Sequence, residues 1–244
     1  MLLSENDRAS AECNIVDVIY ESFVVTADQD FLTARLLARS GLYRAFYWAA
    51  AQSIEKYLKA FILLNGKSVK AKSHSLKGLY DSACAVDSTL RDMNICPHDL
   101  LNVPDYAQGH LTVFSCIDFI SDIDRFGHPN NRYNSFGVDF NSGHLFALDH
   151  FVFNLRGRIQ VPSIWQSMVE VEGGLLDTLR ENNPWFSVHP DSARAPIIVK
   201  MSMAVTKLDF LEAQMKSPPY RLALKWLDQM MKLPAELSKK ISEV

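Results

Sequence analysis

The chain has 244 residues, of which 48% are apolar, and a formal net charge of −3. This composition predicts a folded protein with a sizeable core, and the slight acidity argues against a protein that coats nucleic acid through charge alone. The four scattered cysteines fit free thiols in a reducing compartment better than disulfides or zinc. No apolar run approaches a membrane span and the N-terminus lacks the apolar segment of a secretory signal, so we expect a cytoplasmic protein.

The start of the chain has the least regular pattern. We expect residues 1–13 to be loosely ordered. Residues 15–25 are apolar and β-branched, which predicts a strand or a short helix. Asp28 or Asp30 is predicted to cap a helix that ends near residue 40.

Residues 43–64 are predicted to form a long central helix. Its polar positions lie three or four residues apart and share one face, while apolar and small residues occupy the rest. The polar residues of this face are Gln52, Glu55, Lys56 and Lys59. Asn65-Gly66 supplies the left-handed position that ends a helix. So wide an apolar surface requires neighbours on more than one side, which predicts a helical bundle.

Three more segments complete the predicted bundle. Ser73 or Ser75 is expected to cap a helix over 76–90, and apolar residues recur at helical spacing over 111–123 and 145–159.

The region after residue 162 is broken by glycine and proline pairs, with helical patterns over 198–214 and 220–233. We therefore predict an all-α protein in three parts. These are an N-terminal segment, an antiparallel helical bundle, and a helical extension or small second domain: 1–27, 28–162 and 163–244.

One stretch of the chain carries a family pattern. From 43 to 79 the sequence reads YRAFYWAAAQSIEKYLKAFILLNGKSVKAKSHSLKGL, a long helix with Gln-x-x-Glu-Lys-x-x-Lys-Ala, an Asn-Gly stop, a lysine-rich loop and a His-x-Leu restart. This pattern resembles the HEPN family (higher eukaryotes and prokaryotes nucleotide-binding domains), and the resemblance covers residues 28–160. It implies an antiparallel helical bundle. The family ranges from metal-independent ribonucleases to non-catalytic partner modules, so the resemblance leaves open whether this protein is an enzyme.

Two further features match the family. His74 corresponds to a histidine often found just before the next helix, and it becomes a candidate for ligand contact. Arg132-Tyr133 resembles a pair that often precedes the last bundle helix. Asn134 stands where that pair is commonly followed by proline, a departure from the modules that accompany minimal nucleotidyltransferases.

The ribonuclease branch of the family is recognised by an arginine, a polar neighbour and a histidine four to six residues further on. Arg91, Asp92 and His98 satisfy this spacing. The resemblance implies that the arginine would neutralise a scissile phosphate while the histidine moves the proton of a ribose 2′-hydroxyl. Pro97 prevents the pair from lying on one uninterrupted helix, and an exposed loop or cap is the alternative.

A second candidate site is the turn-rich loop before the last bundle helix. It gathers hydrogen-bond donors and one imidazole: Arg125, His128, Asn130, Asn131 and Arg132. Loops of this kind often bind ligands. The alternative is that the loop is turn chemistry, with the arginines packed against helix ends.

The third candidate is a basic segment. Six lysines and no acidic residue lie between positions 56 and 80: Lys56, Lys59, Lys67, Lys70, Lys72 and Lys77. Such a patch suits phosphate, nucleotide or RNA, and the first two lysines also belong to the HEPN-like pattern. A solvated loop is the alternative, because no aromatic residue interleaves positions 65–77 to stack bases.

These features favour a nucleotide- or RNA-associated helical module without an assigned activity. A metal-independent endoribonuclease and a protein-interaction module are the alternatives. The sequence has no metal-ligand spacing and no phosphate-loop or dinucleotide fingerprint, so we expect neither a metal nor a cofactor. Surplus apolar positions predict a homodimer, with cover by the C-terminal region as the alternative: Phe146, Phe151 and Phe153.

Overall fold

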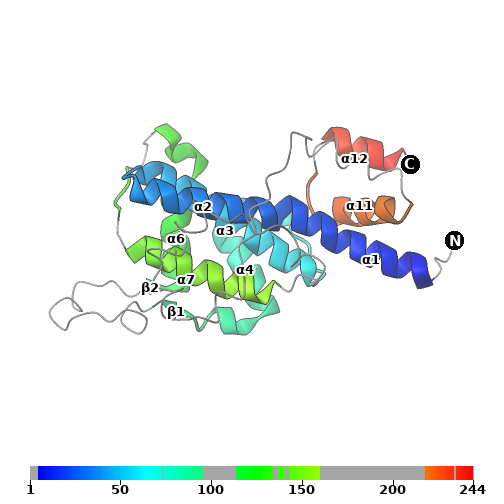
Figure 1. The fold of residues 1–244 in the computed structure, drawn as a ribbon, viewed down its shortest axis with the longest axis horizontal. Coiled ribbons are helices and arrows are strands. Elements are labelled where there is room, and N and C mark those ends of the chain that lie inside the picture. Colours follow the sequence, from blue (N-terminus) through cyan, green and yellow to red (C-terminus); the bar gives the residue numbers. More distant parts are fainter. Residues whose placement is uncertain are drawn as a thin grey trace, which may run out of the picture.

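The computed structural model describes residues 5–72, 74–95, 114–133, 137–140, 143–159, 218–233 and 235–243. Within these ranges the protein is all-α, as predicted, and its helices surround one central helix, α3 (Figure 1). A two-residue antiparallel pair, β1 (Asn94–Ile95) with β2 (Phe114–Ser115), lies at one side of the bundle. No helix of the described ranges combines the length and the apolar character that crossing a membrane requires.

The N-terminal region is a continuous helical rod. Helix α1 (Glu5–Ile19) leads through a π-helical turn, η1 (Tyr20–Val24), into α2 (Val25–Arg39). The predictions of a loosely ordered start and of a strand alternative are therefore wrong. The β-branched residues of this region are buried on helices that pack against α3 and α11, and burial outweighs their intrinsic preference for strands. The predicted cap at Asp28 or Asp30 is also wrong, because the helix continues through both positions.

Helix α3 (Tyr43–Leu64) occupies the middle of the bundle and contacts α2, α4, α6 and α7. Its predicted stop is confirmed: Asn65 caps the helix and Gly66 follows at φ +69°, a left-handed position that glycine adopts without strain. At its other end the chain turns from α2 through Gly41, which has φ +70°.

The remaining bundle helices are α4 (Leu76–Val86), α6 (Cys116–Phe126) and α7 (Gly143–Arg158). Short 3-10 turns lie between them: η2 (Lys70–Lys72), η3 (Ser88–Leu90) and η5 (Pro129–Tyr133). Ser75 caps α4, as one of the two predicted alternatives, by accepting a hydrogen bond from the Gly78 N–H at 3.1 Å. Helix α4 ends four residues before the predicted position 90, because the chain turns at Asp87 into η3.

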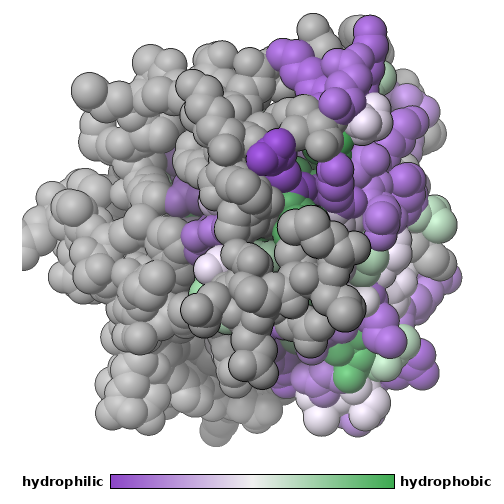
Figure 2. Space-filling view, turned by 90° about the vertical axis from the view of Figure 1, so that its right-hand side faces the viewer, coloured by the Kyte–Doolittle hydropathy of each residue, from purple (hydrophilic) through white to green (hydrophobic). Residues whose placement is uncertain are grey.

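Two helices of the C-terminal region are described, α11 (Pro218–Met230) and α12 (Ala235–Ser242), and α11 packs along α1 (Figure 1). The loop after α3 holds the end of α11. The Val69 N–H donates to the Met230 carbonyl at 2.9 Å, and the Lys70 ammonium donates to the Asp228 carbonyl at 2.9 Å. A lysine at the carbonyl end of a helix is favourable. Around this end of the molecule the described surface is mostly hydrophilic (Figure 2). The predicted helix over 198–214 lies outside the described residues.

Buried charges join the helices that flank α3. Asp28 on α2 accepts hydrogen bonds from Tyr57 on α3 and from Arg156 on α7, the latter at 3.3 Å. Arg35 on α2 pairs with Asp149 on α7. Burial raises the pKa of Asp149, and the Arg35 charge opposes that rise. A buried pair that loses one partner leaves an uncompensated charge, so these contacts hold α7 in register with α2.

Two of the phenylalanines behind the predicted homodimer are buried within one chain. Phe151 is fully buried and Phe146 is 8% exposed, while the side chain of Phe153 lies outside the described ones. Phe146 and Phe151 therefore do not require a second copy to cover them.

Candidate functional site

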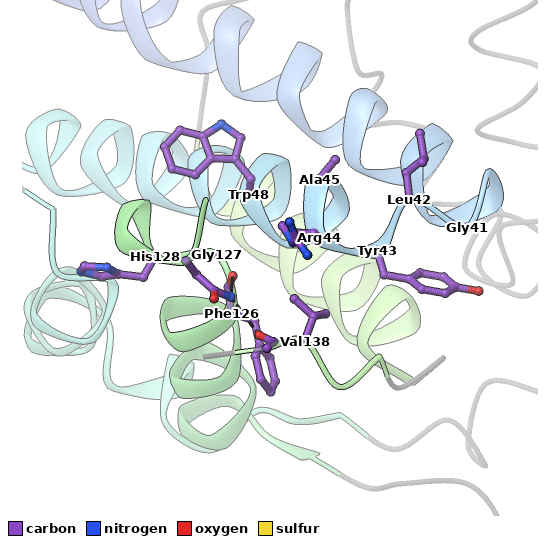
Figure 3. Close-up of a pocket in the computed structure, with 12 residues that line it drawn as sticks. Gly41, Leu42, Tyr43, Arg44, Ala45, Trp48, Phe126, Gly127, His128 and Val138 are labelled. Atoms are coloured by element: carbon purple, nitrogen blue, oxygen red, sulfur yellow. Dashed lines mark hydrogen bonds between the residues drawn. The ribbon is translucent and has the colours of Figure 1, made fainter. Parts of the chain in front are cut away.

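A large open cavity lies between the first turns of α3 and the loop that follows α6 (Figure 3). Its volume is about 900 Å³. We call it the aromatic pocket, and its lining includes Tyr43, Arg44, Trp48, Phe126, His128, Asn131 and Val138. In the view of Figure 3, His128 lies at the left, Tyr43 at the right, and Arg44 between them.

Gly127 brings the two walls of the aromatic pocket together. A Cβ atom at this position would lie 2.4 Å from the Tyr47 carbonyl oxygen, 2.6 Å from Cβ of Ala51 and 2.8 Å from the Ile123 carbonyl oxygen. Such distances are well inside van der Waals contact, so a residue without a side chain lets the end of α6 touch α3. The following residue, His128, consequently lies directly beside the first turns of α3.

Aromatic side chains at the rim of the pocket are accessible to a ligand. Trp48 is 37% exposed and Tyr43 is 40% exposed, unlike the rest of the apolar face of α3. Tyr43 is also held in place, because its ring stacks on Phe140 with centroids 3.8 Å apart and planes 14° from parallel. Exposed, oriented rings of this kind provide surfaces for stacking a planar ligand.

The segment that carries Val138 is tied to α3 by a buried hydrogen-bond network. The Tyr47 hydroxyl donates to the Asp139 carbonyl at 3.0 Å and lies 2.6 Å from Nδ1 of His144. Nε2 of His144 lies 3.2 Å from the Asp122 carboxylate. Burial lowers the pKa of His144, while Asp122 opposes that change. The network therefore ties the neutral imidazole to the wall of the aromatic pocket.

Asn131 fixes the same wall from the other side. Its side-chain amide donates to the Phe126 carbonyl and to the Gly137 carbonyl, both at 3.0 Å. Asn131 is buried, so it acts as the turn residue that the alternative interpretation of this loop predicted.

A second, smaller cavity of about 390 Å³ adjoins the aromatic pocket. We call it the basic hollow, and it is lined by Lys77, Ser121, Asp124, Arg125 and His128. His128 is among the lining residues of both cavities, so the two adjoin at this residue. The hollow lies between the start of α4 and the last turns of α6.

Three cations line these cavities. Arg44, Lys77 and Arg125 are exposed, and within the described residues none of them forms an ion pair. The Arg125 guanidinium lies 5.5 Å from the centre of the Phe126 ring, a cation–π distance. Asp124, the acidic residue of the hollow, hydrogen-bonds the backbone of Leu76 and Lys77 instead, and burial raises its pKa.

The predicted binding residues fall into two groups. Lys56 pairs with Asp30 of α2, while Glu55 pairs with Lys59 at 2.6 Å and with His74 at 3.2 Å. His74 is otherwise exposed, at 79% of its side chain. The Lys56 pair connects α3 to α2, the Lys59 pair lies within α3, and His74 contacts α3 from the turn before α4, while a role of these three residues in ligand binding stays a prediction.

The second group lies at the cavities. Arg125 and His128 line the basic hollow, as the loop hypothesis anticipated, and the Asn130 N–H donates to Nδ1 of His128 at 3.1 Å. Arg132 lies in η5, but its side chain is outside the described ones. The proposed catalytic partner His98 is outside the described residues, and Arg91 is exposed just after η3, so the Arg91–His98 pairing stays a hypothesis.

Sequence reasoning missed Tyr43, Arg44 and Trp48. Apolar periodicity assigns the aromatic residues at the start of α3 to the core, and Phe46 and Tyr47 are buried there. The available signal was the position of Arg44, four residues before Trp48 and therefore on the same face of the helix. Within the described ranges no group of three His, Cys, Asp or Glu residues is arranged to hold a metal ion.

Comparison with known families connects the first part of this site to a named domain. Residues 20–96 match the model of the HEPN domain, which confirms the resemblance predicted from residues 43–79. The match includes α3 and α4, whereas Phe126, Gly127 and His128 lie beyond it. Neither the curated proteins nor the solved structures contain a match to this chain.

Proposed function

We propose that this protein is a non-catalytic module that binds a nucleotide or a single-stranded RNA segment in the aromatic pocket. The observation that carries the proposal is the exposure of Trp48 and Tyr43 beside Arg44, a cation without an ion-pair partner among the described residues. Stacking on an aromatic side chain contributes about 1–3 kcal/mol per base in single-strand binding. An arginine beside the rings supplies a planar, multidentate partner for phosphate.

The lining of the pocket supports an anionic ligand. None of the described residues that line it is acidic, although the whole chain has a net charge of −3. A local positive potential attracts a phosphate even though the protein as a whole is acidic. The HEPN match supports the same class of ligand, because the resemblance implies a nucleotide- or RNA-associated module.

The test is a binding titration of short labelled oligoribonucleotides and of nucleoside monophosphates, followed by fluorescence anisotropy and calorimetry. We expect Trp48→Ala to weaken binding by about tenfold, since that is the effect of losing one stacked base of about 1.4 kcal/mol. Arg44→Gln should weaken binding and reduce its dependence on salt. Lys225→Gln is the matched control, because Lys225 is an exposed residue of α11, remote from the pocket.

A separate variant distinguishes this pocket from the basic segment predicted from the sequence. Lys67→Gln removes an exposed charge from the loop after α3. Equal loss of affinity in Lys67→Gln and Arg44→Gln would indicate that the ligand also contacts the loop after α3. Unchanged affinity in both Trp48→Ala and Arg44→Gln would contradict the proposal.

A protein-interaction module is the second candidate, and one observation favours it. Leu36 and Leu42 are 38% and 55% exposed where α2 turns into α3, close to Tyr43 and Trp48. Exposed apolar side chains that gather in one place often mark a protein interface. The predicted homodimer would use this surface. Light scattering should then give a dimer mass for the wild type and a lower mass for Leu42→Ser.

A further inference from the structure

We propose that the basic hollow binds the phosphate of the nucleotide next to the one stacked in the aromatic pocket, so that the preferred ligand is a strand and not a free mononucleotide. This inference rests on the proposed function of the aromatic pocket. It adds a second subsite, assigned to Lys77 and Arg125, and a minimum ligand length of two nucleotides.

The shared lining of the two cavities is the first argument. His128 lines both of them, because Gly127 holds the end of α6 against α3. A strand that extends from the aromatic pocket past His128 would therefore reach the basic hollow. The imidazole of His128 is exposed at this junction, where it contacts whatever connects the two subsites.

The division of chemistry between the cavities is the second argument. The aromatic pocket is lined by Tyr, Trp and Phe residues, whereas the described lining of the basic hollow has none of these and includes the two cations Lys77 and Arg125. Rings bind bases, and cations bind phosphate.

The disposition of Asp124 is the third argument. This carboxyl lies in the hollow, where the backbone of Leu76 and Lys77 at the first turn of α4 and the imidazole of His128 favour its charged form. It forms no ion pair with Lys77, Arg125 or His128 in the described structure. Because the α4 backbone stabilises the Asp124 carboxylate, Lys77 and Arg125 remain available to bind a ligand.

The decisive measurement compares a nucleoside monophosphate with a dinucleotide that carries a 5′-phosphate, using calorimetry on the full chain. We expect the dinucleotide to bind the wild type about tenfold more tightly, which corresponds to one additional charge-assisted contact. In Arg125→Gln and Lys77→Gln this advantage should shrink to about twofold or less, while the affinity for the monophosphate stays unchanged. The salt dependence of strand binding should fall by about 0.7 in logarithmic slope for each lost phosphate contact.

Asp124→Asn should strengthen dinucleotide binding, whereas Arg125→Gln and Lys77→Gln should weaken it. The amide retains an oxygen that accepts hydrogen bonds from the α4 backbone and removes the negative charge from the hollow. We expect a modest gain of about twofold to threefold in dinucleotide affinity and no change for the monophosphate.

Failure of this inference differs from failure of the proposed function. An equal affinity of the wild type for the two ligands, or a dinucleotide advantage that survives in Arg125→Gln and Lys77→Gln, would overturn the second subsite while leaving the aromatic pocket intact. A wild type that binds neither ligand, or binding that is insensitive to Trp48→Ala, would remove the aromatic pocket as well. Lys225→Gln again serves as the charge-matched control.

Discussion

Two sets of basic residues in this protein have different surroundings, a difference that the sequence does not show. In the first, which we call the paired cations, each charge meets an intrachain carboxylate: Arg35, Lys56, Lys59, Arg156 and Arg158. In the second, the unpaired cations, the described structure offers no acidic partner: Arg44, Lys77 and Arg125. Most of the paired cations connect different elements, Lys59 pairs within α3, and Arg44, Lys77 and Arg125 line two adjoining cavities.

The lysines of the HEPN-like central-helix pattern and the cations of the candidate cavities are therefore different residues. Lys56 and Lys59 belong to the pattern by which the HEPN domain is recognised, and both contribute to contacts within the bundle. A cation that already has a carboxylate at hydrogen-bond distance must lose that partner before it binds a phosphate. An exposed cation without a partner has no such cost, so the cavities at the start of α3 and the end of α6 are the better candidates for a ligand.

The largest effect is expected from a buried member of the paired cations. Arg156→Met should lower the free energy of unfolding by about 3–5 kcal/mol, because it leaves the Asp28 carboxylate buried beside Tyr57 without its cation. Chemical denaturation measures this loss. Adding Asp28→Asn to the same chain should restore part of the stability, and a double variant as unstable as Arg156→Met would show that the pair does not act as a unit.

Gly127→Ala tests the close contact between the end of α6 and α3, which positions the cavities lined by the unpaired cations. The added Cβ would lie 2.4 Å from the Tyr47 carbonyl oxygen, so the helices must separate. We expect a loss of about 1–3 kcal/mol in unfolding free energy, as for other over-packed positions, and weaker ligand binding. Gly157→Ala is the matched control: nothing lies within 4 Å of its Cβ, and alanine in a helix should be neutral or stabilising. Equal stability of the two variants would contradict the close approach.

The buried His144 network predicts a pH dependence. The folded chain keeps this imidazole neutral, since burial lowers its pKa below the ordinary value of 6.5. At pH below that value the unfolded chain binds more protons than the folded one, so stability falls as the pH is lowered. We expect denaturation midpoints to decrease from pH 7.5 to pH 5.5 more steeply in the wild type than in His144→Gln. A parallel decrease in both proteins would assign the dependence to other groups.

The smallest effect is expected from an exposed member of the paired cations. Lys56→Gln breaks a partly solvated ion pair with Asp30 and should change the unfolding free energy by less than about 1 kcal/mol. Ligand affinity should stay within about twofold of the wild type. A loss of affinity comparable to that of Arg44→Gln would place Lys56 in the binding site and remove the distinction between the two sets.

The sequence by itself determined the helical class, the long central helix, its Asn-Gly end, a serine cap at position 73 or 75 and the HEPN resemblance. These features depend on local chemistry: apolar residues at helical spacing, a left-handed glycine, and a hydroxyl beside free backbone N–H groups. The same reasoning failed at residues 5–25, where β-branched residues are helical because other helices bury them.

Only the tertiary structure decided which charged and aromatic residues are available to a ligand. Arg125 and His128 were candidates from their loop, but Arg44 and Trp48 lie on a helix whose apolar residues all resemble core in sequence. Whether a lysine is paired depends on carboxylates that are 26 residues away for Lys56 and on the same helix for Lys59. Pairing and exposure are properties of contacts between segments, and periodicity along one segment carries no information about them.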